Sequence, residues 1–344
     1  MKILFQSYNT CCQNTSGGVQ VRIRKIRNLM VERGYQVDYF SPFETKVSDY
    51  DVLHIFKLTN ECLDLIRCAK LSGVKVVLSS IVGLDGRYKI DIYRLLERLP
   101  FNTFFHNMFE SIKLCDHIIV ETYKEKEFLL KHYGAKKSKI SIIPNGIDSR
   151  TYATPIIYER IGGKKKYILQ VGRFDSNKNQ LNVIRALKNT NIPIVFVGGA
   201  PQGSERKYYN ICLEEAKGYD NFYFLGWQNA DSELLNSAFQ YAHALILPSY
   251  FETFGLVVLE AAEKNLFICM SNTLPILDYN VFDPDLCFSP NNLDEIKSVV
   301  DRVMTREQSV DKYNNLIRNT FSWKKIIDNH IAIYKILIDV ETDD

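Results

Sequence analysis

The chain has 344 residues, of which 46% are hydrophobic, 12% aromatic and 24% charged, and its formal net charge is +3. This composition is typical of a globular protein, and at roughly 100–200 residues per domain it predicts two domains. There is no run of about 18 apolar residues, no zinc-ligand spacing among the cysteines, and the start MKILFQSYNT turns polar too early for a signal peptide. We therefore exclude an integral membrane protein, a secreted disulfide scaffold and a zinc-finger protein, and expect a cytoplasmic chain with reduced thiols.

The positive charge is concentrated in the first half of the chain. Residues 1–155 hold 23 Lys and Arg against 16 Asp and Glu, which is +7, whereas residues 156–344 hold 20 against 24, which is −4. A basic half joined to an acidic half indicates that one half faces an anionic surface or ligand. A solvated surface with an uneven distribution of charge would give the same count.

Short apolar runs alternate with helix-length segments along almost the whole chain. Runs that are apolar throughout are typical of parallel strands with both faces covered, and the segments between them are long enough for crossover helices. The predicted strands are 2–8, 36–40, 52–56, 74–80, 117–122, 140–144, 166–172, 193–199, 222–226, 243–249 and 267–272. We therefore predict an α/β fold made of two doubly wound, Rossmann-like parallel sheets.

The predicted domains are 1–155 and 156–322, and residues 323–344 form a helix that packs back towards the first domain. The boundary segment 149–165 follows the turn Pro144-Asn145-Gly146, and it contains further proline and glycine. Parallel α/β domains bind ligands at the carboxyl ends of their strands, and a cleft between two such domains is the default site.

The first candidate site is Gly17-Gly18, which follows the first strand and opens a helix over 19–33. Glycine lets a ligand approach the backbone, and the helix N-terminus offers free N–H groups with partial positive charge. An ordinary glycine turn is the alternative. The spacing is not GxGxxG, so a dinucleotide fingerprint is absent.

The second candidate is QVGRFDSNKNQ at 170–180, which follows the first strand of the second domain. Arg173 and Lys178 lie on either side of its strand-to-helix turn. Two cations beside helix N–H groups could neutralise a diphosphate. Two surface cations without a ligand are the alternative.

The third candidate is LPSYFETFGLVVLEAAEKN at 247–265, which contains Glu252, Gly255 and Glu260. We expect Glu252 in the loop before a helix and Glu260 within it, which does not fit the paired carboxylates of a glycoside hydrolase. A carboxylate on a mostly apolar helix needs a partner, and a pair of sugar hydroxyls could supply one. An ion pair or exposure to solvent is the alternative.

Taken together, these segments resemble the retaining glycosyltransferases of family 4, which have the GT-B fold. The resemblance is weakest over 81–114. The matching segments, in the order of the family, are 16–40, 115–148, 168–180, 196–199, 224–227, 248–265 and 321–335.

The resemblance implies a role for each residue of the second domain. Arg173 and Lys178 would hold the donor diphosphate, Glu252 would contact the donor sugar, and Glu260 would bind the ribose. Together with Arg173 and Lys178, Glu252 is predicted to be catalytic. The resemblance also implies donor contacts from Gly172, from the backbone at Phe254, Gly255 and Leu256, from Trp227 and Gln228 near the base, and from Gly17 and Gly18 in the other domain.

The resemblance also implies the reaction and its partners. The expected donor is a UDP-sugar or a GDP-sugar, and the expected acceptor is a glycan or a lipid-linked glycan of cell-surface polysaccharide synthesis. Retention of configuration is implied by the family alone. We expect no cofactor and no metal, because Arg173 and Lys178 supply the positive charge. The sequence Asp283-Pro284-Asp285 has DxD spacing but is read as a turn.

One departure from the family concerns the donor-sugar side. Many relatives have a histidine after the fourth strand, where this chain reads VVLSSIVGLDGR at 77–88. His54, after a neighbouring strand, and Asn145, in the Asn-Gly-Ile-Asp turn, are candidates for the cleft. A core histidine is the favoured alternative for His54.

Basic and aromatic residues alternate over 87–114, and the helix at 19–33 adds Arg22, Arg24, Lys25 and Arg27. With the +7 charge, this pattern favours an anionic membrane leaflet as a further partner of the first domain, at the inner face of the membrane. Core-packing aromatics with solvated charges are the alternative. Nothing else supports nucleic-acid binding.

Two other functions stay open at this point. A nucleotide-sugar epimerase on the same fold would need a histidine in the cleft, and a non-catalytic nucleotide-sugar-binding subunit would not need the glutamates and cations to be intact. A nicotinamide dehydrogenase is disfavoured because GxGxxG is absent.

Overall fold

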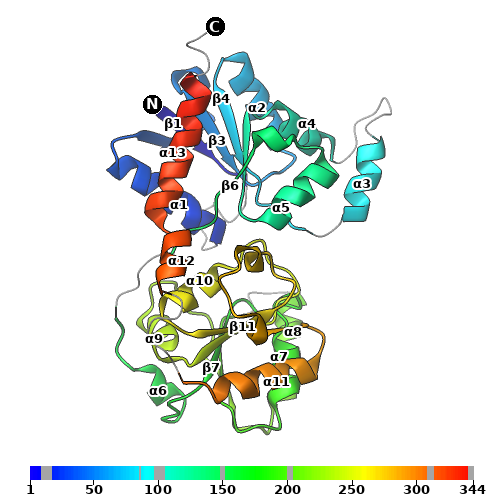
Figure 1. Cartoon of the computed structure of the whole chain (residues 1–344), viewed down its shortest axis with the longest axis vertical. Coiled ribbons are helices and arrows are strands. Elements are labelled where there is room, and N and C mark those ends of the chain that lie inside the picture. The colour runs from blue at the N-terminus through cyan, green and yellow to red at the C-terminus, as the bar shows by residue number, and fades with distance from the viewer. Residues whose placement is uncertain are drawn as a thin grey trace. The chain divides into compact units, whose positions relative to one another are not determined.

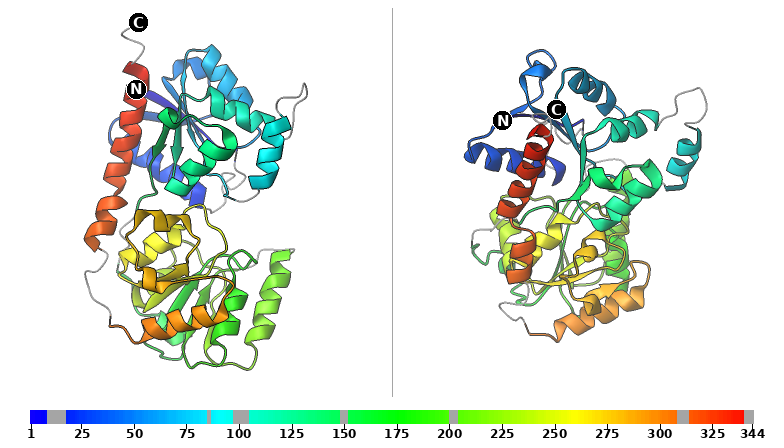
Figure 2. Two further views of the ribbon diagram at one scale, coloured as in Figure 1. Left: turned by 45° about the vertical axis from the view of Figure 1, so that its right-hand side comes forward. Right: turned by 45° about the horizontal axis from the view of Figure 1, so that its top comes forward.

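The computed structural model describes residues 1–8, 18–84, 87–96, 105–147, 152–199, 204–307 and 314–339. The chain divides into two compact units, Met1–Asn145 with Trp323–Asp344, and Gly146–Ser322 (Figure 1). The division therefore falls after Asn145, earlier than the boundary predicted at residue 155. Helix α13 (Trp323–Asp339) groups with the first unit, although the chain reaches it only after the second (Figure 2).

The first unit is built on a six-stranded, all-parallel sheet with the order β2-β1-β3-β4-β5-β6. All six predicted strands are present, each shorter than predicted by a residue or more except β3. The strands are β1 (Lys2–Gln6), β2 (Gln36–Tyr39), β3 (Val52–Phe56), β4 (Lys75–Ser79), β5 (His117–Val120) and β6 (Ile140–Ile142). The α-helices are α1 (Gly18–Glu32), α2 (Cys62–Leu71), α3 (Arg87–Leu96), α4 (His106–Leu114), α5 (Tyr123–Phe128) and α13. Short 3-10 helices η2 (Val47–Asp49) and η4 (Lys137–Lys139) and a π-helical segment η3 (Leu129–Tyr133) complete the unit.

Both faces of this sheet are buried, as its uniformly apolar strands predicted. Successive residues of a strand point to opposite faces, so Leu53 and Ile55 join the core beneath α2, α4 and α5. Val52 and Phe56 join the other core, beneath α1 and α13. Helix α13 thus completes the covering of one face, which explains why it groups with the first unit.

The second unit has a second six-stranded parallel sheet, with the order β12-β11-β10-β7-β8-β9. The strands are β7 (Ile168–Val171), β8 (Ile194–Val197), β9 (Phe222–Phe224), β10 (Ala244–Leu247), β11 (Phe267–Ser271) and β12 (Cys287–Phe288). The helices are α6 (Ile157–Arg160), α7 (Gln180–Leu187), α8 (Ser204–Ala216), α9 (Glu233–Tyr241), α10 (Leu256–Glu263), α11 (Leu293–Met304) and α12 (Asn314–Thr320), with turns η5 (Pro275–Tyr279) and η6 (Pro284–Leu286).

Strand β12 is the one described strand that the apolar pattern missed, because two residues are too few to show a period. Turn η6 confirms the turn predicted at residues 283–285, and the Asp283 carboxylate accepts a hydrogen bond from the backbone N–H of Asp285. Helices α6, α9, α10 and α12 cover one face of the sheet, and α7, α8 and α11 cover the other. The doubly wound architecture is therefore present in each unit.

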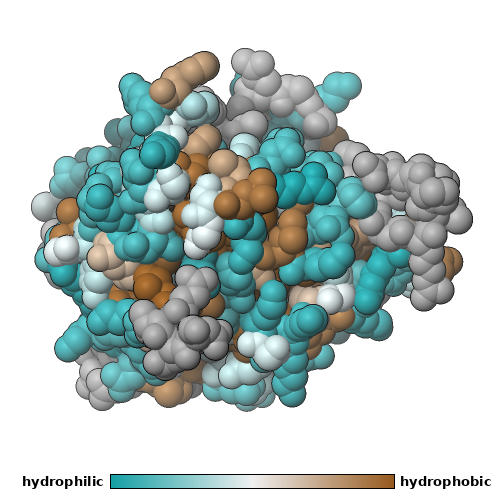
Figure 3. All heavy atoms as spheres, turned by 90° about the horizontal axis from the view of Figure 1, so that it is seen from above, coloured by the Kyte–Doolittle hydropathy of each residue, from teal (hydrophilic) through white to brown (hydrophobic). Residues whose placement is uncertain are grey.

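The exposed surface mixes hydrophilic and hydrophobic residues on the face shown in Figure 3. Within the described ranges, no helix combines the length and the apolar character needed to cross a bilayer.

Candidate active site

The Lys178 and Glu252 side chains meet at one edge of the second sheet. Lys178 follows β7 and Glu252 follows β10, and these two strands are neighbours in the sheet. The Nζ of Lys178 lies 2.5 Å from Oε1 of Glu252, which also accepts a hydrogen bond from the Ser249 hydroxyl at 2.7 Å. The chain continues from β7 to β8 on one side and later adds β10 on the other. The pair therefore lies at the switch point of the sheet, where parallel α/β domains bind ligands.

Side-chain amides join the two loops that carry this ion pair. Asn177 donates to the carbonyl of Phe251 at 2.8 Å, and Asn179 donates to the carbonyl of Pro248 at 3.1 Å. These contacts hold the loop after β7 against the loop after β10, and so they fix the position of Lys178. The sequence did not reveal them, because asparagine is common in turns whatever its side chain binds.

Arg173 lies in the same loop as Lys178 but makes a separate set of contacts. Its guanidinium lies 3.3 Å from Asp175 and 3.4 Å from Glu205, and the side chain is 57% exposed. The Gln180 side chain donates to the Arg173 carbonyl at 2.7 Å, which ties this residue to the start of α7. A guanidinium has five N–H donors, so two carboxylate contacts leave it able to bind a further anion.

Glycines after β7 and β8 allow these loops to approach one another closely. Gly198 has a φ of +151°, and a Cβ at this position would lie 1.8 Å from the carbonyl oxygen of Gly172. Only glycine fits there. A Cβ on Gly172 would lie 3.7 Å from Cδ of Lys178, so the aliphatic part of the lysine runs along this glycine.

Helix α10 begins directly beside the ion pair. Gly255 precedes the helix with a φ of +96°, and a Cβ there would lie 4.0 Å from Cγ of Glu252. Phe254 is buried in the core, and Leu256 is the first helical residue. The first-turn N–H groups of a helix have no partner within it and attract negative charge. Glu260 lies about one turn further along α10 and is partly buried.

Trp227 and Gln228 follow β9 at the same edge of the sheet. Trp227 is 56% exposed. A Cβ added at Gly199 would lie 3.3 Å from the Cβ of Trp227, so the loop after β8 passes close to this tryptophan. The Gln228 side chain donates to the Leu225 carbonyl at 3.1 Å. The loops after β7, β9 and β10 thus place Arg173, the Lys178–Glu252 pair, the start of α10 and an exposed aromatic ring at the same edge of the sheet. Cations and N–H groups in this arrangement can stabilise a departing anion such as a diphosphate.

Comparison with known proteins matches a family model to each of the two parts of the chain. The family model described as "Glycosyl transferases group 1" matches residues 158–323, and the model "Glycosyltransferase Family 4" matches residues 43–151. The chain belongs to the group 1, family 4-like glycosyltransferases.

Individual relatives of this glycosyltransferase agree with that assignment. It is 23% identical to an uncharacterised glycosyltransferase of Methanocaldococcus jannaschii, over 86% of this chain and 77% of the relative. It is 28% identical to an Escherichia coli UDP-Gal:alpha-D-GlcNAc-diphosphoundecaprenol alpha-1,3-galactosyltransferase, over 66% of this chain and 59% of the relative. The O-antigen chain mannosyltransferase RfbU of Salmonella typhimurium is 24% identical, over 64% of this chain and 61% of the relative. The last two alignments thus span about three-fifths of those relatives.

Solved structures confirm the fold of this glycosyltransferase. A sucrose-phosphate synthase from Thermosynechococcus elongatus matches with a TM-score of 0.74 at 15% identity, over 99% of this chain and 100% of that one. Anabaena HepE in complex with UDP and glucose matches with a TM-score of 0.73 at 15% identity, over 97% and 99%. The predicted GT-B fold is therefore confirmed. The family models and the named relatives support nucleotide-sugar-dependent glycosyl transfer, and the epimerase and the non-catalytic subunit are not favoured.

The glycine pair predicted for the first unit is only partly described. Gly18 is exposed and is the first residue of α1, whereas Gly17 lies outside the described residues. The phosphate contact of this pair stays a prediction.

His54 is a core residue, as the favoured alternative predicted, and it does not line an open site. Its side chain is fully buried on β3, beneath α13. Nδ1 lies 2.6 Å from the Tyr334 hydroxyl and Nε2 lies 2.8 Å from the Ser79 hydroxyl, while the ring stacks on Phe56 at 4.0 Å. Burial holds the pKa of His54 well below its usual value, so the ring is neutral and structural.

A buried polar cluster lies at the carboxyl edge of the first sheet. Arg22 on α1 pairs with Glu121, and Asn145 donates to the same carboxylate at 2.9 Å. Arg22 is only 2% exposed, so its predicted contribution to a basic membrane-facing surface is wrong. Asn145 is buried as well, so this cleft candidate also belongs to the cluster. A helix that carries several arginines gives no sign of which one points inward.

Glu125 is the second carboxylate of this cluster. Its Oε1 accepts hydrogen bonds from the Ser80 hydroxyl at 2.6 Å and from the Val82 N–H at 3.1 Å. Burial, and then the negative charge of Glu121, raise the pKa of Glu125 to about 7. Ser80, in the segment 77–88 where the resemblance implied a histidine, therefore binds this buried acid.

The raised pKa of Glu125 should make the stability of the first unit depend on pH. A glutamate in the unfolded chain has a pKa near 4.3, so between about pH 4 and pH 7 the unfolded state ionises while the folded state stays protonated. The free energy of unfolding should therefore fall as pH rises through this window. Glu125→Gln has no carboxyl group to ionise at this position, so it should not show this fall. The free energy of unfolding of the variant, relative to that of the wild type, should therefore rise by about 2–3 kcal/mol between pH 4.5 and pH 7.5, as measured by chemical denaturation.

Glu127→Gln is the matched control for this measurement, because Glu127 lies on the same helix and is exposed. We expect the stability difference between this control and the wild type to stay constant across the window. A constant difference for Glu125→Gln as well would contradict the raised pKa.

Proposed function

We propose that the chain transfers a sugar from a UDP-sugar or a GDP-sugar to a glycan or lipid-linked acceptor in cell-surface polysaccharide synthesis. The observation that carries the proposal is the contact between Lys178 and Glu252 at the switch point of the second sheet. Two comparisons support it. One relative is named as using UDP-Gal and a diphosphoundecaprenol-linked acceptor, and one structural neighbour contains UDP and glucose.

In the proposed reaction the donor diphosphate lies against Lys178, Arg173 and the first N–H groups of α10. Negative charge grows on the diphosphate as the bond to the sugar breaks, and these groups stabilise it. Glu252 orients the ammonium and contacts the sugar, and Glu260 binds the ribose hydroxyls. Trp227 and Gln228 lie near the base.

We add three proposals about cofactors, stereochemistry and location. Arg173 and Lys178 neutralise the charge of the leaving diphosphate, so transfer needs no metal and no other cofactor. The configuration at the anomeric carbon is retained, as the family resemblance implies. The chain works in the cytoplasm, at the inner face of a membrane that holds its acceptor.

A thermal-shift screen of nucleoside diphosphates tests donor recognition. A ligand that binds only the folded state adds about 2.7 kcal/mol of stability at 100 times its dissociation constant. We expect UDP or GDP to raise the melting temperature, and nucleosides without phosphate to raise it far less. NMR of the product formed in the presence of EDTA then tests retention and metal independence together. No shift with any nucleoside diphosphate would contradict the proposed function.

A further inference from the structure

A pocket of about 350 Å³ lies in the first unit, at the carboxyl ends of β1 and β2 and beside the first two turns of α1. Among the described residues, it shares none with the candidate active site of the second unit. Its polar lining consists of Gln6, Ser7, Gln20, Arg24 and Tyr39, and apolar side chains complete it. The volume is at the small end of the usual range for ligand pockets, which is about 300–1,000 Å³.

Strand pairing and helical spacing bring the lining residues together. Phe5 of β1 lies opposite Tyr39 of β2, and the Phe40 N–H donates to the Phe5 carbonyl at 2.9 Å. Gln20 and Arg24 are four residues apart on α1, so they lie on the same side of the helix. The edge of the sheet thus supplies aromatic rings to the pocket, and the helix supplies an amide and a guanidinium.

Gln20 is the side chain that most directly indicates a ligand. It is only 6% exposed, and its amide has no hydrogen-bond partner among the residues that the structure describes. Buried side-chain amides in folded proteins are nearly always hydrogen-bonded. We therefore expect a molecule in the pocket to accept from the N–H groups of Gln20 and to donate to its carbonyl oxygen.

Tyr39 gives the pocket a fixed aromatic wall. The Arg27 guanidinium lies over its ring, 5.1 Å from the centre, and Arg27 Nε donates to the Val37 carbonyl at 2.9 Å. Because the arginine is tied to the backbone of β2, it holds the ring in place. The tyrosine is still 47% exposed, so part of its apolar surface is available to a ligand.

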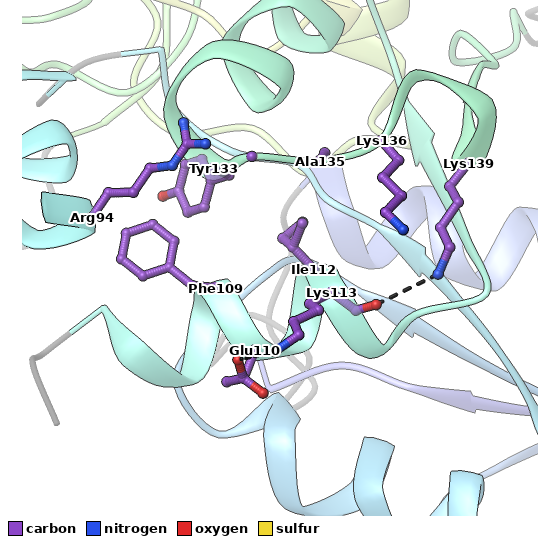
Figure 4. A pocket seen from close by; sticks show the side chains of 10 residues that line it. Arg94, Phe109, Glu110, Ile112, Lys113, Tyr133, Ala135, Lys136 and Lys139 are labelled. Carbon is purple, nitrogen blue, oxygen red and sulfur yellow. Dashed lines mark hydrogen bonds and ion pairs between the residues drawn. The ribbon is translucent and has the colours of Figure 1, made fainter. Parts of the chain in front are cut away.

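The lining of the pocket favours a neutral polyhydroxyl ligand over a phosphate. Arg24 is its one cationic side chain within the described ranges, whereas another pocket of the same unit is lined by Arg94 and three lysines (Figure 4). An ionised oxyanion only accepts hydrogen bonds, so it would leave the carbonyl oxygen of Gln20 without a donor. Sugar hydroxyls donate and accept, and the C–H face of a sugar ring is apolar enough to pack on an aromatic ring.

We propose that this pocket binds a sugar unit of the acceptor glycan, with ring hydroxyls at Gln20 and Arg24 and the apolar face of the sugar against Tyr39. The inference rests on the proposed function, because it names a part of the acceptor that the enzyme would extend. The pocket contains none of the groups proposed to stabilise the leaving diphosphate. It therefore selects the acceptor by a sugar that does not react.

Saturation-transfer NMR on the full chain tests the pocket. The probes are the methyl glycosides of glucose, galactose, mannose, rhamnose and N-acetylglucosamine. We expect at least one of them to receive saturation, most strongly at the ring protons that contact Tyr39. Gln20→Leu and Tyr39→Ala should each weaken the binding of that glycoside about 5- to 10-fold, as expected for the loss of hydrogen bonds or of an aromatic contact.

Two variants of the same unit serve as matched controls. Gln36 is an exposed amide at the start of β2 that donates to Asp38 at 2.8 Å, and Tyr88 is 75% exposed on α3. Gln36→Leu and Tyr88→Ala should bind the glycoside like the wild type.

Thermal unfolding distinguishes a sugar contact from a structural role. Gln20→Leu replaces a buried amide that no described residue binds, so the melting temperature of the variant should equal or exceed that of the wild type. Weaker glycoside binding at unchanged or higher stability is the result expected for a residue that contacts the ligand.

The outcomes separate this inference from the proposed function. Equal glycoside binding by Gln20→Leu and Gln36→Leu would overturn the pocket, and so would a signal lost only in Glu252→Gln, at the candidate active site. Uridine or guanosine binding that Gln20→Leu removes, without any glycoside binding, would overturn the sugar as the ligand. A thermal shift with UDP or GDP, without glycoside binding in the pocket, would reject the pocket and keep the glycosyltransferase.

Discussion

Replacing Lys178 by alanine should lower kcat/KM for sugar transfer by about 100-fold or more, because one charged contact to the transition state is worth about 3–4 kcal/mol. The ammonium lies at the switch point of the second sheet, and two asparagines hold its loop in place. The substitution also leaves Glu252 without its cation, next to the position proposed for the donor. Repulsion between this carboxylate and the diphosphate should therefore add to the loss.

Lys188→Ala provides the matched control for this prediction. Lys188 follows the C-terminal end of α7 and pairs with Glu215 at 2.8 Å, so its removal also breaks a partly buried ion pair of the same unit. We expect this control to keep transfer within about twofold of the wild type. If Lys178→Ala retained the kcat/KM of the control, Lys178 would not hold the donor.

Replacing Arg22 by methionine should lower the free energy of unfolding of the first unit by about 3–5 kcal/mol, since breaking a buried ion pair leaves a buried charge without its partner. Arg22 and Glu121 are almost completely buried, and Asn145 donates a hydrogen bond to the same carboxylate. Urea denaturation, followed by hydrogen exchange of the β5 amides, measures this loss.

Two further variants distinguish the charge from the packing of the arginine. Arg24 lies two residues away on α1 and is exposed, so Arg24→Met should change stability by no more than about 0.5 kcal/mol. The double variant Arg22→Met/Glu121→Gln removes both charges and should recover part of the loss. A double variant no more stable than Arg22→Met would show that the arginine acts through packing alone.

The fold was predictable from the sequence because its main signal is local. Uniformly apolar runs indicate strands covered on both faces, and eleven such runs correspond to the eleven longer strands of the structure. The pairing of Lys178 with Glu252 was not visible in this way, because 74 residues separate them in the chain. Only the strand order, which places β7 beside β10, shows that the two loops meet.

The first unit shows why charge patterns alone could mislead. Arg22 and Arg24 look alike in the sequence, yet the helix buries the first and exposes the second. His54 was one candidate for the site, but it lies within β3, and its face of the sheet is covered by a helix from the far end of the chain. Such long-range packing leaves no local mark on the residues concerned.

Hydrogen exchange with and without UDP or GDP tests the central claim, that the diphosphate binds at the switch point of the second sheet. We expect a bound nucleoside diphosphate to slow exchange in residues 172–179 and 252–260, and Lys178→Ala to reduce this protection at the same ligand concentration. Protection confined to other segments, while the chain still releases the nucleotide from its sugar donor, would contradict the account.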